Sequence, residues 1–112
     1  MARSPTADAF RAIAEPRRRE IIALLARGER SVNDLVETLR LAQPQVSKHL
    51  AVLSRVGLVR VRKDGRQRFY RLNAKALKPV HDWVKLFEQL WNDRLDRLDE
   101  YLNELQTKGK PK

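Results

Sequence analysis

The side chains best suited to chemistry lie in residues 43–57, which the spacing of apolar residues predicts to be a helix. Val46, Leu50 and Leu53 fall on one narrow stripe at about 100° per residue. The other positions carry amides, an imidazole and cations but no carboxylate, and they are Gln45, Lys48, His49, Val52 and Arg55. Amides pair with adenine edges and cations with guanine or phosphate, so this face suits a nucleic acid. A solvated helix face is the alternative, and the neighbouring segments favour the first interpretation.

A second, shorter helix precedes this one. Ser31 opens it with capping-box spacing. Pro44 suits the first turn of the later helix, and Gly57 suits the residue just past its end. Because only a tight turn fits between the two helices, we predict a helix-turn-helix over residues 31–57.

A basic hairpin is predicted directly afterwards, over residues 58–72. Two runs rich in β-branched and aromatic residues flank Asp64 and Gly65, which is a strong hairpin signal. The cations of the hairpin are Arg60, Arg62, Lys63, Arg66, Arg68 and Arg71. This arrangement is typical of the wing of a winged helix, and an exposed edge protected by charge is the alternative.

The sequence leaves the strand register of this hairpin open. A two-residue loop pairs Val61 with Arg68, whereas a three-residue loop with a bulge pairs Val59 with Phe69. We favour the second register because it groups apolar residues on one face.

A long helix is predicted over residues 77–105, with a wide apolar stripe. The stripe consists of Val80, Trp83, Val84, Phe87, Leu90, Trp91, Leu95, Leu98, Leu102 and Leu105. At 1.5 Å per residue the helix would be roughly 40 Å long, too long for the short upstream helices to cover. The simplest partner is a second copy of the chain. We expect residues 107–112 to be a disordered tail.

Two short helices are predicted at the start of the chain. Thr6 caps the first, and Pro16 starts the second. Residues 17–19 are three arginines in the first turn of the second helix, where the helix dipole is already positive. An anionic partner and a solvated charge run explain this placement equally well.

Composition limits the function classes. The 112 residues suit one domain, which we place at residues 6–106. Lys and Arg number 24 against 14 acids, a net charge of +10 that favours nucleic acid over an anionic membrane surface. The absence of cysteine excludes disulfides and thiol catalysis, and no Gly-rich phosphate loop is present, so we expect no enzyme. No apolar run has the length of a signal peptide or a membrane span, and we expect a cytoplasmic protein with no membrane partner.

The order of these elements, together with several short motifs, resembles the ArsR-type winged-helix repressors. The motifs lie at residues 10–22 (FRAIAEPRRREII), 43–50 (QPQVSKHL), 57–59 (GLV) and 64–66 (DGR). The resemblance implies a mainly α fold with a small β-hairpin, a winged helix-turn-helix with a long C-terminal dimerisation helix. It also implies a homodimeric transcriptional repressor that places a helix in the major groove of double-stranded DNA. Two-fold symmetry of this kind calls for an inverted-repeat operator.

The resemblance also implies roles for individual residues. The base readers would be Gln45, Ser47, Lys48 and His49, with Gln43 near the DNA backbone. The wing residues Arg62, Lys63, Arg66 and Arg68 would contact the minor groove or phosphates, and Arg55 adds a cation to the DNA-facing helix. The first and last helices would build the dimer through Phe10, Ile13, Trp83, Phe87, Leu90, Trp91 and Leu98. One departure is Ala42, where many relatives have a Ser or Thr that caps the recognition helix.

The best-known members of that family sense metals, and we expect this chain to belong to a non-metal subgroup without a cofactor. The Cys-x-Cys site of the family is missing, and His81 lacks matching ligands downstream. Two alternative functions stay open. One is a winged helix that binds protein, and the other is a regulator of the same fold that responds to a small molecule bound beside Trp83 and Trp91.

Overall fold

The computed structural model describes residues 4–109, whose elements follow the predicted order. The elements are α1 (Pro5–Ile13), α2 (Pro16–Leu25), β1 (Arg30–Ser31), α3 (Val32–Leu39), α4 (Gln43–Arg55), β2 (Val59–Asp64), β3 (Gln67–Leu72), the 3-10 helix η1 (Ala74–Leu77), α5 (Lys78–Lys85) and α6 (Glu88–Gly109). The chain divides into two compact units, one ending at Val80 and the other beginning at His81. The fold is therefore mainly helical with a small antiparallel sheet, as the sequence predicts.

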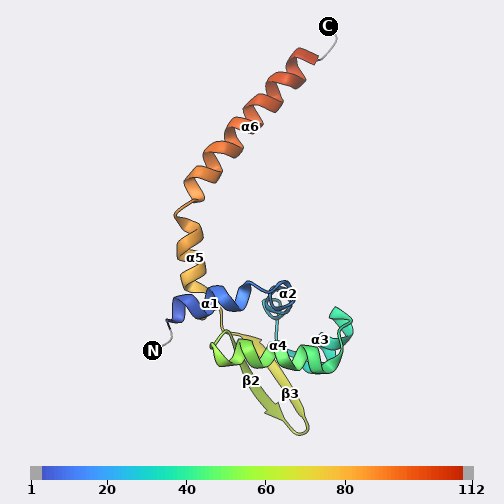
Figure 1. Ribbon diagram of the computed structural model, residues 1–112. Helices are drawn as coiled ribbons and strands as arrows, with labels where there is room; N and C mark the ends of the chain where they lie inside the picture. Colours follow the sequence, from blue (N-terminus) through green and yellow to red (C-terminus); the bar gives the residue numbers. More distant parts are fainter. Residues whose placement is uncertain (1–3, 110–112) are drawn as a thin grey trace. The chain divides into compact units, whose positions relative to one another are not determined.

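The core of the first unit lies between the helices and the sheet. The predicted stripe of α4 is confirmed, because Val46, Leu50 and Leu53 are completely buried. The rest of the buried core cluster consists of Ala12, Ile21, Leu25, Leu35, Leu58 and Val59. In Figure 1, α4 lies beside the hairpin formed by β2 and β3, and α4 contacts β2. Packing of its apolar stripe thus leaves the polar side of α4 at the surface.

The helix-turn-helix is confirmed as α3 and α4, and its turn is built without glycine. Ser31 caps α3, since its Oγ accepts the Asp34 N–H at 3.1 Å. Arg40 ends α3 in the left-handed conformation, with φ 55° and ψ 41°. A residue with a Cβ atom pays about 1 kcal/mol or more for this conformation, which glycine adopts freely. Past the end of α4, Gly57 has φ +79°, as its position predicts.

The register that the sequence favoured for the hairpin is wrong, and so is the two-residue alternative. Val59 pairs with Leu72 and Val61 with Tyr70. The connection consists of Gly65 and Arg66, one residue later than expected. Gly65 has φ +63°, which suits the first central position of a tight hairpin turn. This register places apolar residues opposite one another on one face, which explains why it is favoured over the other two.

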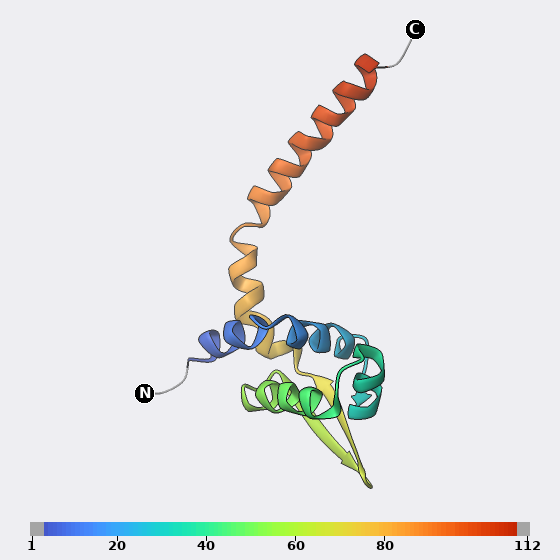
Figure 2. The same cartoon turned by 45° about the vertical axis from the view of Figure 1, so that its right-hand side comes forward.

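A third strand, β1, was not predicted. It pairs antiparallel with β3, with Arg30 opposite Tyr70 and Ser31 opposite Phe69, so the strand order is β1-β3-β2. Two residues are too few to show the alternation that predicts a strand. The strand anchors one edge of the hairpin beside the start of α3, while the turn of the hairpin projects away from the helices (Figure 2).

The start of α1 also differs from the expectation. Ser4, rather than Thr6, caps this helix, since its Oγ accepts the Ala7 N–H at 3.4 Å. Pro5 occupies the first turn, where its missing N–H costs nothing, and this moves the start of the helix upstream.

The arginines of residues 17–19 have acceptors within the chain, which were not predicted from the sequence. Arg18 Nε donates to the Ala12 carbonyl at 2.6 Å, and Arg19 Nη1 donates to the Ile13 carbonyl at 2.8 Å. Arg17 pairs with Glu20 at 3.0 Å. The last carbonyls of a helix lack partners within the helix and lie at its negative end. The start of α2 therefore supplies the cations that cap the end of α1.

The helix expected over residues 77–105 is divided into shorter elements. η1 leads directly into α5, which ends at Lys85, and a turn at Leu86 and Phe87 separates α5 from α6. In this turn the Leu86 and Phe87 N–H groups donate to the carbonyls of Trp83 and Val84, three residues back. The turn contains no glycine or proline, so the break was not predictable from residue types. α6 continues to Gly109, so the tail expected from residue 107 begins inside this helix, and residues 110–112 lie outside the described residues.

Within residues 4–109, none of the helices combines the length and the apolar character that crossing a bilayer requires.

Candidate nucleic-acid interface

The polar face of α4 is accessible. Gln43, Gln45, Lys48 and Arg55 are exposed, while Ser47 and His49 are half-buried. Spacing of four residues puts Gln43 and Ser47 on one flank of the helix, and Gln45 and His49 on the other. Gln43 Nε2 donates to Ser47 Oγ at 3.1 Å, so the first flank is already ordered. Whether these side chains contact DNA stays a prediction.

A groove of about 420 Å³ runs between α4 and the hairpin. Its lining residues are Ser31, Val32, Asn33, Gln43, Ser47, Ala51, Arg66, Gln67, Arg68 and Tyr70. The groove brings together four predicted contact residues, Gln43 and Ser47 from α4 with Arg66 and Arg68 from the hairpin. The described residues that line it include two cations and no carboxylate. Helix and hairpin thus present one polar surface with a positive charge.

The start of α4 is satisfied without the Ser or Thr cap that Ala42 lacks. Pro44 has no N–H, and the Gln45 N–H donates to the Ala42 carbonyl at 3.0 Å. The side chain of Gln45 reaches back, so that its Oε1 accepts the Ala42 N–H at 3.3 Å. This is the half of a capping box that the third helical residue supplies. One lone pair of the Gln45 carbonyl oxygen is therefore occupied, while its second lone pair can accept a hydrogen bond from a base edge.

His49 has one ring nitrogen inside the protein. Its Nδ1 is buried and has no hydrogen-bond partner among the described residues. Any contact of His49 with a base therefore has to use another part of the ring.

The hairpin has two faces with different cations. Side chains alternate along each strand, and directly opposed residues point to the same face. Val59, Val61 and Lys63 of β2 therefore share a face with Arg68 and Tyr70 of β3, which we call the inner face. The outer face carries Arg60, Arg62, Phe69 and Arg71. Tyr70 and Arg68 line the groove, so the inner face is the one continuous with α4.

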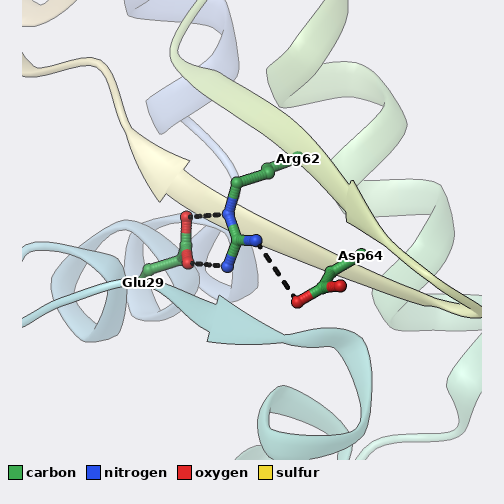
Figure 3. A network of polar contacts seen from close by, with 3 residues as sticks. All are labelled: Glu29, Arg62 and Asp64. Atoms are coloured by element: carbon green, nitrogen blue, oxygen red, sulfur yellow. Dashed lines mark hydrogen bonds and ion pairs between the residues drawn. The ribbon is translucent and has the colours of Figure 1, made fainter.

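Arg62, one of the predicted DNA-contact residues, has acidic partners within the protein. Its Nη2 donates to Glu29 Oε1 at 2.7 Å, and its Nε donates to Glu29 Oε2 at 3.3 Å (Figure 3). The hydrogen bonds from Arg62 lower the pKa of the Glu29 carboxyl, and the same pairing raises the pKa of Arg62. Lys63, Arg66 and Arg68 are exposed.

Sequence reasoning missed four polar residues of the groove, namely Ser31, Asn33, Gln67 and Tyr70. Ser31 was recognised only as a helix cap. The others lie on elements whose register or neighbour was unknown, and only β1 and the correct hairpin register bring them beside α4. In the part of the chain that the structure describes, no three His, Cys, Asp or Glu residues gather as a metal site would need.

Comparison with known proteins places this architecture in a family. The model of the bacterial regulatory proteins of the arsR family matches residues 15–61, which run from the start of α2 into β2. The transcriptional repressor SdpR of Bacillus subtilis is 30% identical over 80 residues, covering 71% of this chain and 89% of that protein. A probable mercury resistance operon repressor of Streptomyces lividans is 37% identical over 94 residues, covering 84% of this chain and 73% of that one.

Comparison with solved structures points to the same family. A crystal structure of an ArsR family transcriptional regulator has a TM-score of 0.67 and 30% sequence identity, covering 82% of this chain and 97% of its own. The match in sequence includes the helix-turn-helix, and the match in structure includes nearly the whole of that regulator. The chain therefore belongs to the ArsR family of DNA-binding, winged helix-turn-helix transcriptional regulators.

Proposed function

We propose that the protein is a homodimeric repressor that binds an inverted-repeat operator, with α4 of each subunit in the major groove. The observation that carries this proposal is the polar groove that joins the exposed flank of α4 to the cations of the hairpin. Cations around such a groove attract the phosphate backbone, while amides and hydroxyls on the helix suit base edges. The relatives whose names state a role include repressors, which supports repression as the role of this chain.

The proposed contacts divide into two kinds. Base edges are read by Gln45, Ser47, Lys48 and His49 of α4. Phosphates are held by Gln43, Arg55, Lys63, Arg66 and Arg68. Base contacts specify a sequence, whereas phosphate contacts position the protein. The cations are exposed, and the described lining of the groove contains no carboxylate, which suits contacts with phosphates.

The proposed dimer is supported by the apolar side of the second unit. Trp91 is 63% exposed, and Leu95, Leu98, Leu102 and Leu105 are each about half exposed. From Trp91 onward these residues recur at alternating intervals of four and three, the spacing of a coiled-coil seam. A contiguous apolar surface of this length is a liability in a monomer. The same α6 of a second copy offers a seam of equal length and pattern. Phe10 and Ile13 of α1 are proposed to add to the interface.

We further propose that regulation uses no thiolate-bound metal, because the sequence contains no cysteine. This is a finer proposal than the family itself, since one relative is named as a mercury resistance operon repressor.

The experiment that tests the proposed function compares the protein with Trp91→Asp. We expect the unaltered protein to have twice the chain mass by light scattering and to protect two half-sites about 10 base pairs, or a multiple, apart in a footprint. Transcription from a template that carries the protected site should fall. Trp91→Asp should be monomeric and should lose the footprint, because it buries a charge in the seam.

Gln89→Asp is the matched control, since it introduces the same charge about 160° away from Trp91 around α6. It should behave like the unaltered protein. A Trp91→Asp protein that remains dimeric and protects the operator would overturn the proposed interface. A dimer that protects no duplex would overturn the proposed operator binding.

A further inference from the structure

A single side chain crosses the outer face of the hairpin. Arg62 of β2 lies opposite Phe69 of β3, and Phe69 lies opposite Ser31 of β1, so one row runs across all three strands. The guanidinium of Arg62 lies 4.8 Å from the centre of the Phe69 ring, within the range of a cation–π contact. Beyond the ring it meets Glu29, the residue before β1 (Figure 3). Arg62 therefore spans the sheet from the β2 edge to the β1 edge.

Every nitrogen of this guanidinium has an acidic partner. Nη2 and Nε donate to the two oxygens of Glu29 at 2.7 and 3.3 Å, and Nη1 lies 3.6 Å from Asp64 Oδ2. A two-point pairing of this type fixes the orientation of the arginine as well as its position. The two N–H groups that face Glu29 are therefore occupied, and the nearby carboxylates of Glu29 and Asp64 oppose the approach of a phosphate to the other N–H groups. Lys63, its neighbour in β2, has its side chain on the inner face instead.

We propose that Arg62 is a positioning residue. Its bridge to Glu29 holds the hairpin against β1, and thereby aims Lys63, Arg66 and Arg68 at the DNA backbone without contacting DNA itself. The inference rests on the proposed function of the inner face. Because an exposed ion pair contributes little to global stability, the effect falls on the orientation of the hairpin and not on folding.

The test uses Glu29→Gln, Arg62→Gln and the exchanged pair Glu29→Arg with Arg62→Glu. Glu37→Gln serves as the control, because it removes the same charge from an exposed position of α3. Two quantities are measured. The first is duplex affinity as a function of salt, whose logarithmic slope counts phosphate contacts. The second is amide hydrogen exchange of β2 and β3 in the absence of DNA.

We expect both Glu29→Gln and Arg62→Gln to weaken duplex binding by roughly 3-fold with an unchanged salt slope. The amide hydrogens of the hairpin should exchange faster in both variants than in the unaltered protein. Glu29→Gln is the most informative, since removal of a negative charge would by itself strengthen binding, as Glu37→Gln should. The exchanged pair should recover the affinity to within about 2-fold and restore slow exchange, because the bridge can form in the opposite direction.

The opposite results would overturn the proposal. If Arg62 binds a phosphate, Arg62→Gln flattens the salt slope by about 0.9, Glu29→Gln strengthens binding, and the exchanged pair binds worst. Unchanged hydrogen exchange in both single variants would show that the bridge does not hold the hairpin, whatever the DNA result. Failure of the unaltered protein to bind any duplex would instead overturn the proposed function, and the exchange measurement would still decide whether the bridge exists.

Discussion

Two basic regions of the molecule, residues 17–19 at the start of α2 and the cations of the hairpin, have different partners. Arg18 and Arg19 donate to carbonyls at the end of α1, and their charge complements the dipole of that helix. Arg66 and Arg68 line an open groove. Net charge alone does not distinguish these uses. What distinguishes them is whether an internal acceptor lies within reach of the side chain.

Arg62 combines the two situations. It belongs to the hairpin, yet its partners are Glu29, Asp64 and the Phe69 ring, all inside the same unit. The six cations of the hairpin are therefore not equivalent candidates for DNA contacts. The strand register decides which of these cations lie on the inner face of the hairpin, which is continuous with α4.

The largest expected effect follows removal of the groove cations. Arg66→Gln combined with Arg68→Gln should weaken duplex binding roughly 10- to 100-fold at moderate salt, because two charge-assisted contacts are lost. The slope of log affinity against log salt should flatten by about 1.8, which is 0.9 for each phosphate released. Fluorescence anisotropy over a range of salt concentrations measures both quantities.

The matched control makes the same change of charge in the other basic region. Arg17→Gln combined with Arg19→Gln removes two charges from the start of α2, where both arginines have internal partners. Its salt slope should match that of the unaltered protein. Equal flattening by the two pairs would mean that the whole positive field, and not the groove, determines binding.

A smaller effect is expected from Arg18→Met, and it should affect stability instead of binding. The variant loses the partly buried bond from Nε to the Ala12 carbonyl and the exposed bond from Nη2 to the Arg11 carbonyl. Hydrogen bonds from charged groups contribute about 1.5–3 kcal/mol, and an unsatisfied buried carbonyl adds its own penalty. We expect the free energy of unfolding in urea to fall by about 2 kcal/mol, with the salt slope unchanged.

Arg19→Met is the matched variant, since its bonds to Ile13 and Ala14 are exposed and water can replace them. It should lose clearly less stability than Arg18→Met. Equal stability of Arg18→Met and the unaltered protein would contradict the capping role that the structure gives to Arg18.

The same physical distinction explains which features were predictable from the sequence. The apolar stripe of α4 was predictable, because Val46, Leu50 and Leu53 repeat with the period of a helix, and proline and glycine mark the ends of the helix. The partners of arginines 18, 19 and 62 were not predictable, because a long side chain reaches acceptors that only tertiary packing brings near. Arg62 and Glu29 are 33 residues apart in the chain.

The hairpin shows a second limit. A single glycine fits several turns, and moving Gly65 to the first position of the loop changes every pair along both strands. The groove residues Asn33, Gln67 and Tyr70 depend on that register and on β1, so they were out of reach of periodicity. The break at Leu86 and Phe87 likewise has no local cause in residue type.

The smallest expected effect concerns the bridge between the two edges of the sheet. Because Arg62 lowers the pKa of Glu29 below its ordinary value of 4.5, the folded state favours the ionised carboxylate. The stabilising contribution of the bridge is therefore complete above that ordinary pKa and is lost as the pH falls through the lowered one. Nuclear magnetic resonance of the Arg62 Nε–H group should report a transition with its midpoint below 4.5. Glu29→Gln should abolish this transition, whereas a midpoint at or above the ordinary value, or a transition that persists in Glu29→Gln, would mean that Arg62 is not held by Glu29 in solution.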